Sequence, residues 1–213
     1  ATGVMASELT HPYYTFLDGG MDVDLASIQG GEIPIDPQTL RFMVKSPEDE
    51  RYLNDKLAQA KVNNAIPIAG LDIGQYDIVF LSGGWGAAYD FAQSNILGAK
   101  ISEAYATEKI IAAVCHGPLG LVGAVKQDGS PLVEGVKLTG VTNKQLKQLM
   151  VGETPKHPET ELRKLNADYQ SNSGFIDMFR SHIEIDKNHR IVTGQNQKCG
   201  INAAIEAMRL LVG

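Results

Sequence analysis

The chain has 213 residues, of which 43% are hydrophobic and 21% charged, and its formal net charge is −6. This composition is typical of a soluble globular protein. The acidic balance argues against a nucleic-acid partner, and the apolar runs fall far short of the roughly 20 residues that a membrane helix needs. Only two cysteines are present, far apart at Cys115 and Cys199, which favours a reducing, cytoplasmic setting over a disulfide framework.

The N-terminal part predicts two helices and a strand. Thr10 resembles a helix N-cap, with Pro12 in the first turn and Gly19-Gly20 ending the helix. Residues 21–27 alternate apolar and polar side chains like a strand. Ser46 opens a second helix with a capping-box pattern. The residues expected on the buried face of that helix are Leu53, Leu57 and Ala60.

The rest of the chain alternates strands with helices. Strands are predicted at 77–81, 109–114, 136–141, 183–185 and 190–193. Helices are predicted at 94–107, 118–125, 144–150, 158–165 and 201–211. Continuous apolar runs in the strands indicate a mostly parallel sheet that is covered by helices on both faces. We therefore predict the α/β class, with a doubly wound sheet in a single domain over 1–213.

The start of the chain is unusual for this fold class. A doubly wound sheet usually begins with a strand, but residues 1–7 are too few and too small to form a good one. We therefore expect the true first strand to be missing from this sequence.

The segment Cys115-His116-Gly117 directly follows the predicted strand 109–114, where parallel α/β sheets bind ligands. A cysteine on such a strand-to-helix turn resembles a nucleophile elbow. The helix N-terminus that follows would push the thiol toward the thiolate. The competing interpretation is an inert core cysteine, which is common.

Two further segments belong to the same predicted edge. Gly83 and Gly84 follow the strand 77–81, where glycines let backbone N–H groups approach a developing negative charge; the alternative is a plain turn. Glu8 precedes the predicted first helix. It is either a solvated carboxylate or, if burial raises its pKa, a proton-transfer group for Cys115.

The other candidate residues suggest less chemistry. His157 and His189 fall in polar, turn-like stretches and are expected at the surface, and His182 is expected at a strand edge. Cys199 is expected to have a packing role. Since no histidine pair has zinc-ligand spacing with either cysteine, we predict no metal site. The sequence has no phosphate loop either, and we predict no cofactor.

Together these segments resemble the ThiJ/PfpI superfamily, which has the flavodoxin-like fold of the class I glutamine amidotransferases. The similarity covers nearly the whole chain and is closest to the branch of glutathione-independent glyoxalases and stress-induced holding chaperones. The strongest matches are AAVCHGP at 112–118, FLSGGWGAAYDF at 80–91 and SELTHPYYTF at 7–16. Weaker matches are LVEGVKLTGVTN at 132–143, HPETELRK at 157–164 and VTGQNQ at 192–197.

The resemblance implies a role for each matched position. Cys115 corresponds to the reactive cysteine, His116 to the histidine that follows it, and Glu8 to the carboxyl group that approaches the thiol. The backbone N–H groups of Gly84 and His116 would form the oxyanion hole. Gly83 and Trp85 would line the pocket, which the bulky Trp85 would narrow.

The chain also departs from the family pattern. Members of this branch often carry an acidic residue shortly after the threonine that matches Thr142, and it completes a Cys-His-acid arrangement. The stretch here is TNKQLK at 142–147, which contains no carboxylate. Glu153 is the nearest substitute along the chain.

The activity implied is conversion of methylglyoxal, or a similar small aldehyde, to a hydroxy acid such as lactate through a Cys115 hemithioacetal. Repair of early glycation adducts would use the same residues. Two alternatives remain: a stress chaperone or redox-responsive protein with an oxidisable Cys115, and a cysteine hydrolase or peptidase that would need His182 or His189 as its base. A homodimer is the usual state of the family.

Overall fold

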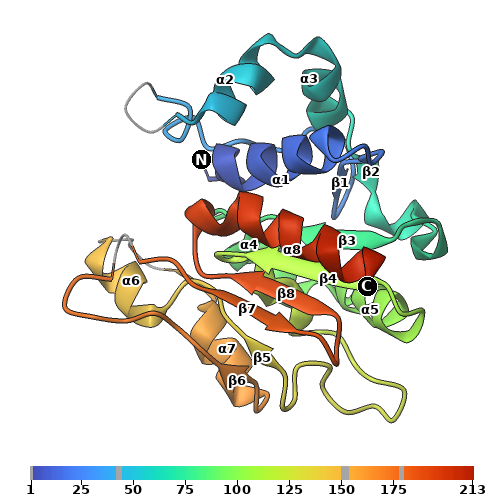
Figure 1. Cartoon of the computed structure of the whole chain (residues 1–213), viewed down its shortest axis with the longest axis vertical. Helices are drawn as coiled ribbons and strands as arrows, with labels where there is room; N and C mark the ends of the chain where they lie inside the picture. Colours follow the sequence, from blue (N-terminus) through green and yellow to red (C-terminus); the bar gives the residue numbers. More distant parts are fainter. Residues whose placement is uncertain (1, 42–44, 150–153, 178–179) are drawn as a thin grey trace.

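The computed structural model describes residues 2–41, 45–149, 154–177 and 180–213. Its central sheet has the strand order β3-β4-β8-β7. The bounds are Ile78–Leu81 for β3, Ile110–Val114 for β4, Ile191–Gly194 for β8 and Ile183–Asp186 for β7. β3, β4 and β8 run parallel, and β7 is antiparallel to β8. The sheet crosses the middle of the molecule in Figure 1, and it confirms the predicted mostly parallel α/β fold.

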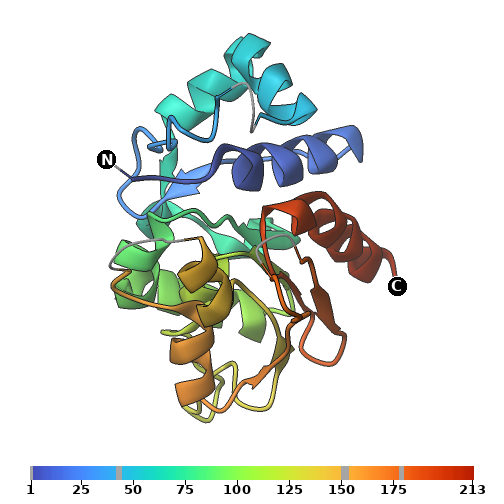
Figure 2. The ribbon, with the colours of Figure 1, turned by 90° about the vertical axis from the view of Figure 1, so that its left-hand side faces the viewer.

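Helices cover both faces of this sheet because β4 is apolar on both sides. Ile111 packs into the cluster that contains side chains of α5, at Asn95–Ala106. Ala112, one residue on, packs into the opposite cluster with α8, at Gly200–Val212. This alternation of successive side chains is the ordinary geometry of a strand. Figure 2 shows the sheet from the side, with α8 against one face.

The N-terminal part forms a layer beyond α8. α1, at Ala6–Asp18, packs against α8, and two short helices cover α1 from the outside. These are α2 at Pro47–Asn54 and α3 at Lys56–Asn63. In this layer β1 (Ala26–Ser27) pairs in parallel with β2 (Ile66–Pro67), as a small sheet separate from the central one.

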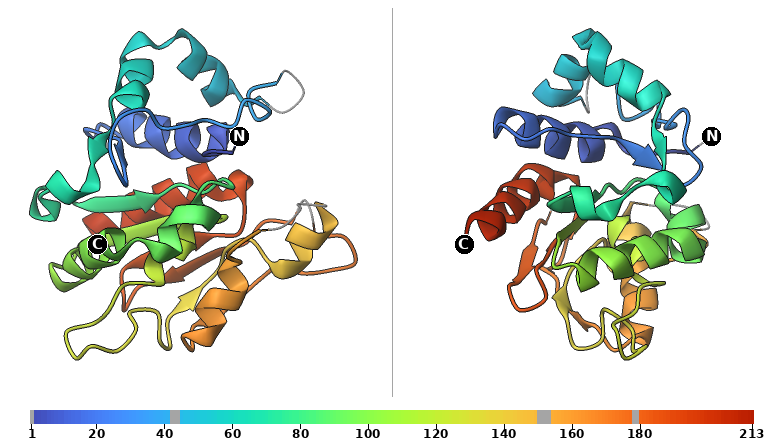
Figure 3. Two further views of the ribbon diagram at one scale, coloured as in Figure 1. Left: turned by 180° about the vertical axis from the view of Figure 1, so that it is seen from behind. Right: turned by 90° about the vertical axis from the view of Figure 1, so that its right-hand side faces the viewer.

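The small sheet at residues 137–138 and 168–169 and the helix at 158–164 lie at the other end of the molecule, in yellow and orange in both views of Figure 3. β5 (Lys137–Leu138) pairs in parallel with β6 (Asp168–Tyr169). The further α-helices are α4 at Ala87–Asp90, α6 at Asn143–Gln148 and α7 at Pro158–Lys164. The 3-10 helices are η1 (Ile68–Gly70), η2 (Ile73–Gln75), η3 (Phe91–Gln93), η4 (Gly117–Leu121) and η5 (Gln197–Cys199).

The predicted start of the first helix was wrong. α1 begins at Ala6, so Thr10 and Pro12 lie inside it. The Thr10 hydroxyl makes no cap; it donates a hydrogen bond to Asp49 Oδ1 at 2.6 Å, in a buried contact between α1 and α2. The hydroxyl that resembled a local N-cap signal is thus used in a tertiary hydrogen bond to a residue 39 positions away. The helix ends before Gly19, as predicted.

The second predicted helix is split. Ser46 forms the predicted capping box, but α2 stops at Asn54, and Asp55 then caps α3 by accepting N–H bonds from Leu57 and Ala58. This break changes the helical phase, so the predicted buried face was wrong. Leu53 and Leu57 are 39% and 79% exposed, and Ala60 is exposed. The buried positions are Tyr52, Ala58 and Val62.

Three other predicted elements are shorter than expected. In 21–27 only Ala26–Ser27 forms a strand, because the preceding residues have no ladder partner among the described residues. In 136–141 only Lys137–Leu138 does so. The predicted helix 118–125 is the 3-10 helix η4, in a stretch with Pro118 and several glycines that disfavour an α-helix.

Candidate active site

Cys115 directly follows β4 and has a backbone φ of 57°, a left-handed value that is rare outside glycine. Its N–H donates to the Gly194 carbonyl at 2.9 Å, and its own carbonyl accepts the Val141 N–H at 2.9 Å. The strained conformation is therefore held from both sides. A strained residue that its surroundings hold in place is typical of functional sites, and this is the elbow that the sequence predicted.

The turn after β3 needs its two glycines. A Cβ atom on Gly83 would lie 2.1 Å from Glu8 Oε2, and one on Gly84 would lie 2.3 Å from the Met5 nitrogen. Gly84 also has a φ of 96°. Because no side chain intervenes, the Glu8 carboxylate comes directly against this backbone.

Glu8 lies in the first turn of α1 and is fully buried, so the interpretation as a solvated carboxylate is excluded. Burial raises its pKa from the usual 4.5 to about 8, opposed by the Cys115 thiol and the N–H groups of Gly84 and Gly83. Neither carboxylate oxygen makes a hydrogen bond of ordinary geometry. These neighbours are therefore weak partners, and desolvation decides the protonation of Glu8.

The Cys115 thiol has a pKa well above its usual value, because it is buried and because the Glu8 carboxylate lies beside it. The residue as a whole still keeps part of its surface accessible. The backbone N–H groups of His116 and Gly84 point toward the sulfur and lower the pKa by less. The predicted shift toward the thiolate is therefore wrong. η4 has only five residues and a correspondingly small dipole, so it cannot offset burial beside an acid.

His116 presents Nδ1 to the Cys115 sulfur at 3.5 Å. The residue is only 6% exposed, and its Nε2 atom is buried without a hydrogen-bond partner. Burial, with a smaller contribution from nearby His157, lowers the pKa of His116 to about 4. His116 is therefore neutral at physiological pH and can accept a proton or a hydrogen bond at Nδ1.

His157 was expected at the surface, but it is partly buried and close enough to influence His116. It stands at the N-cap of α7, and its Nδ1 lies 3.2 Å from Asn143 Oδ1. Asn143 Nδ2 donates to Thr160 Oγ1 at 3.0 Å, which leaves the amide oxygen as the acceptor for His157. Sequence reasoning missed this residue. The available signal was the helix start His157-Pro158, since a proline in the first turn fixes where α7 begins.

The stretch that follows Thr142 contains no acid for His116. Thr142 caps α6 through a capping box with Gln145, and Asn143 faces His157. Glu153, the suggested substitute, lies outside the described residues.

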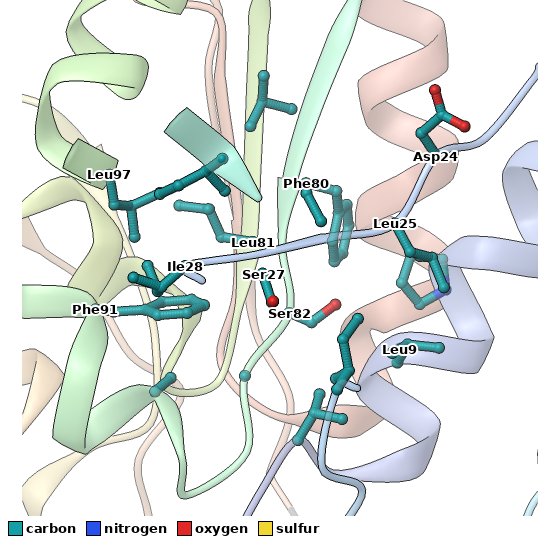
Figure 4. Close-up of a pocket in the computed structure, with 18 of the residues that line it drawn as sticks. Leu9, Asp24, Leu25, Ser27, Ile28, Phe80, Leu81, Ser82, Phe91 and Leu97 are labelled. Carbon is teal, nitrogen blue, oxygen red and sulfur yellow. The ribbon is translucent and has the colours of Figure 1, made fainter. Parts of the chain in front are cut away.

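Gly83 and Trp85, the two residues predicted to line the pocket, have different surroundings. Gly83 lines an apolar cavity beside β3 that residues of both α1 and α5 also line, whereas Trp85 is not among its lining residues. Figure 4 shows this cavity in close-up. The Trp85 indole Nε1 is buried without a hydrogen-bond partner. Glu8 and His116 likewise have a buried polar atom without a hydrogen-bond partner. Such atoms are rare in native structures, and binding of a ligand would account for them.

The other predicted residues lie apart from this constellation. His182 Nε2 pairs with Glu184 at 2.6 Å, just before the edge strand β7, and His189 Nδ1 pairs with Asp186 at 2.9 Å. Cys199 is 1% exposed and belongs to the apolar cluster under α8. Its packing role is thus confirmed, and both histidines are already paired with acids.

The described residues contain neither a cluster of metal ligands nor a membrane-spanning helix. Across the described ranges, no three His, Cys, Asp or Glu side chains gather in a way that could hold a metal ion. No helix in those ranges combines the length and apolar character that crossing a bilayer requires.

Comparison with known proteins decides the family. The family model described as DJ-1/PfpI matches residues 1–196. The chain belongs to the DJ-1/PfpI family. Among its curated relatives, the glutathione-independent glyoxalase HSP31 of Saccharomyces cerevisiae is 34% identical over 72% of this chain and 62% of its own length. Glyoxalase 3 of Candida albicans is 30% identical over 67% of this chain and 61% of its own length. The aligned regions therefore span about three-fifths of these relatives.

Solved structures of the DJ-1/PfpI family superimpose over nearly the whole chain. The 24 kDa rapid encystment protein of Francisella tularensis has a TM-score of 0.89 and 29% identity, and the match covers 99% of this chain and 90% of that one. Glyoxalase III of Candida albicans has a TM-score of 0.85 and 25% identity, with 98% and 88% covered. These matches confirm the predicted fold.

Proposed function

We propose that this DJ-1/PfpI protein is a glutathione-independent glyoxalase that converts methylglyoxal or a similar small aldehyde to a hydroxy acid. The observation that carries the proposal is the buried pair of Glu8 and Cys115, in which the pKa of Glu8 is raised to about 8. A carboxyl group with a pKa near neutrality can both accept and return a proton. Two relatives that share its family are named glyoxalases.

In the first step Glu8, as the carboxylate, takes the thiol proton while the Cys115 sulfur attacks the aldehyde carbon. The high pKa of the thiol requires a base at this moment. The aldehyde oxygen becomes an oxyanion beside the N–H groups of Gly84 and His116, which already point toward the sulfur. Return of the proton from Glu8 to this oxygen completes the hemithioacetal.

In the second step Glu8 removes the hydrogen on the former aldehyde carbon as a proton, and the hydroxyl proton of that carbon passes to the ketone oxygen. At the resulting enediol stage Glu8 then delivers its proton to the former ketone carbon. The aldehyde carbon is thereby oxidised to a thioester, and the ketone carbon is reduced to an alcohol. Water then cleaves the carbon–sulfur bond, which releases lactate and restores the thiol. The balance is one methylglyoxal and one water to one lactic acid, with no external oxidant or reductant.

Two observations favour this function over a redox sensor and over a hydrolase. A redox sensor needs a thiolate of low pKa, whereas the pKa of Cys115 is raised. A hydrolase would need His182 or His189 as its base, and each is paired with a carboxylate of its own, Glu184 or Asp186. Two further expectations accompany the proposal: a cytoplasmic location, from the two distant cysteines, and a homodimer, which the family resemblance implies.

The test is proton NMR of the full chain with methylglyoxal in D₂O, without glutathione. We expect lactate to form with deuterium partly incorporated at C2, because the proton carried by Glu8 exchanges with solvent. Absence of lactate would overturn the proposed activity. Lactate with no deuterium at C2 would leave the activity standing and replace the enediol route with a direct hydride shift.

A further inference from the structure

Tyr169 is a buried titratable residue that the proposed mechanism does not use. It lies in β6, where it pairs with Leu138 of β5. Burial raises the pKa of its hydroxyl well above the usual value, with smaller contributions from the Glu159 carboxylate and the Cys115 thiol. The hydroxyl therefore keeps its proton around neutral pH and serves as a hydrogen-bond donor, not as an acid or a base.

The Tyr169 hydroxyl is connected to the elbow through the backbone of Val141. It donates to the Val141 carbonyl at 3.1 Å, in a buried contact between residues 28 positions apart. The N–H of the same valine donates to the Cys115 carbonyl at 2.9 Å. Val141 is thus held by Tyr169 and in turn holds the strained cysteine.

Gly140 leaves room for this connection. A Cβ atom on Gly140 would lie 2.9 Å from the Cys115 carbonyl oxygen, 2.9 Å from the Tyr169 hydroxyl oxygen and 3.2 Å from Pro118 Cγ. Both oxygens therefore face the same glycine, and a methyl group at this position would push against each of them. The elbow and Tyr169 pack against opposite sides of one short backbone segment.

The carbonyl that Val141 holds belongs to the same peptide unit as the His116 N–H. In a planar trans peptide the C=O and N–H groups point in opposite directions. Since the Cys115 carbonyl points toward Val141, the His116 N–H points away from it, toward the sulfur. Fixing the carbonyl therefore also fixes the direction of a donor that the proposed mechanism uses for the oxyanion.

We infer that Tyr169 is a positioning residue of the active site, which acts through Val141 to aim the His116 N–H at the oxyanion. The effect on turnover rests on the proposed glyoxalase function. Tyr169 is itself held by Arg163 of α7, whose guanidinium donates to the Tyr169 carbonyl at 3.1 Å and lies over the ring, with Cζ 5.3 Å from the centroid. The tyrosine therefore links α7 to the elbow.

Tyr169→Phe removes the hydroxyl, keeps the ring and tests the inference directly. We expect kcat/KM for lactate formation to fall about tenfold, less than the roughly 10²–10³-fold cost of removing an oxyanion-hole donor outright. In proton–nitrogen NMR the amide signals of Val141 and His116 should both shift, because the peptide that Val141 holds is no longer fixed. Tyr14→Phe is the matched control, since Tyr14 is also buried and its hydroxyl donates to Asp55 at 3.2 Å in the N-terminal layer. It should change neither the activity nor these signals.

Gly140→Ala disturbs the same connection from the other side. Its methyl group would press on the Cys115 carbonyl and the Tyr169 hydroxyl, so kcat/KM should fall at least as far as in Tyr169→Phe. The double variant should lose less than the two single losses combined, because both changes break one connection. Gly70→Ala is the control and should keep its activity, since an added Cβ there meets no atom of the described chain within 4 Å.

The outcomes separate this inference from the proposed function. If the parent protein forms no lactate, the proposed activity fails, and the His116 amide signal alone decides whether Tyr169 fixes that N–H. If the parent is active, an unshifted His116 signal in Tyr169→Phe, or kcat/KM within twofold of the parent, would overturn the positioning role. Equal losses in Tyr14→Phe would trace the effect to general packing and overturn it as well.

Discussion

The two cysteines of this protein follow neighbouring parallel strands, and their surroundings differ sharply. Cys115 follows β4, and its N–H donates to the carbonyl of Gly194, the last residue of β8. Cys199 comes five residues after Gly194 and packs against it: a Cβ atom added to Gly194 would lie 2.4 Å from the Cβ atom of Cys199. Yet Cys199 is sealed in the apolar cluster under α8, where its thiol donates to the His182 carbonyl at 3.3 Å.

Cys115, in contrast, has a strained backbone, an unpartnered acid beside it and two N–H groups aimed at its sulfur. Its thiol is thus surrounded by groups that can exchange protons and hold negative charge, whereas the Cys199 thiol faces only neutral acceptors, the His182 carbonyl and Asn196 Oδ1. Placement at the carboxyl ends of the strands alone therefore does not give a thiol these surroundings. The polar groups that distant segments supply make the distinction, and the following changes test it.

The largest effect is expected from removing the nucleophile. Cys115→Ala should lower kcat/KM for methylglyoxal by at least about 10³-fold, because the covalent step is lost. Cys199→Ala is the matched control; it should retain activity within a few-fold and lose stability on the order of 1 kcal/mol from its packed site. Lactate formation measured by NMR gives both values. Equal activity of the two variants would contradict the assignment of Cys115 as the nucleophile.

The next effect concerns the base. Glu8→Gln should lower kcat by roughly 10²–10⁴-fold, the usual contribution of a general base. For the parent enzyme kcat/KM should rise with pH through about 8, where Glu8 becomes the carboxylate. Glu48→Gln, on the partly exposed carboxylate that pairs with His11, should leave the profile unchanged. A pH profile that is flat between 6 and 9 for the parent would contradict the assignment of Glu8.

The same carboxyl group should limit stability. A folded pKa of about 8, raised above the usual 4.5, means that the folded protein binds the proton more tightly than the unfolded chain. Stability is then greatest below pH 4.5 on this account and falls as the pH rises toward 8, by on the order of 3 kcal/mol at pH 7. Glu8→Gln should remove this slope and raise the free energy of unfolding at pH 7. Urea unfolding at several pH values measures it, and parallel slopes for parent and variant would refute it.

The smallest effect is expected at His157. His157→Leu removes the neighbouring imidazole whose electrostatic effect, second to burial, lowers the pKa of His116. The pKa of His116 should therefore rise from about 4, with less than a tenfold change in kcat. Ring-nitrogen NMR of His116 reports the shift directly. His189→Leu, whose native partner is Asp186, is the control that should leave His116 unchanged; equal shifts in both variants would remove His157 from the site.

Local sequence patterns predicted the scaffold well where a short segment carries its own signal. β3, β4 and α5 match their predicted ranges to within a residue or so, because apolar strands and a serine N-cap at Ser94 are local features. The failures came where a distant group intervened. Thr10 bonds Asp49 instead of capping α1, and Asp55 interrupts a helix that the apolar spacing alone extends.

The sequence by itself determined the chemical groups of the site and their order along the chain: a glutamate first, then glycines after one buried strand, and then a cysteine after the following strand. Only the tertiary structure decided how those groups behave. The pKa of Glu8 rises because α1 buries it against Gly83 and Cys115, and His157 reaches the site because Asn143 holds it there. Burial and proximity depend on contacts between segments that are far apart in the chain, so local sequence patterns cannot predict them, although they set the pKa values.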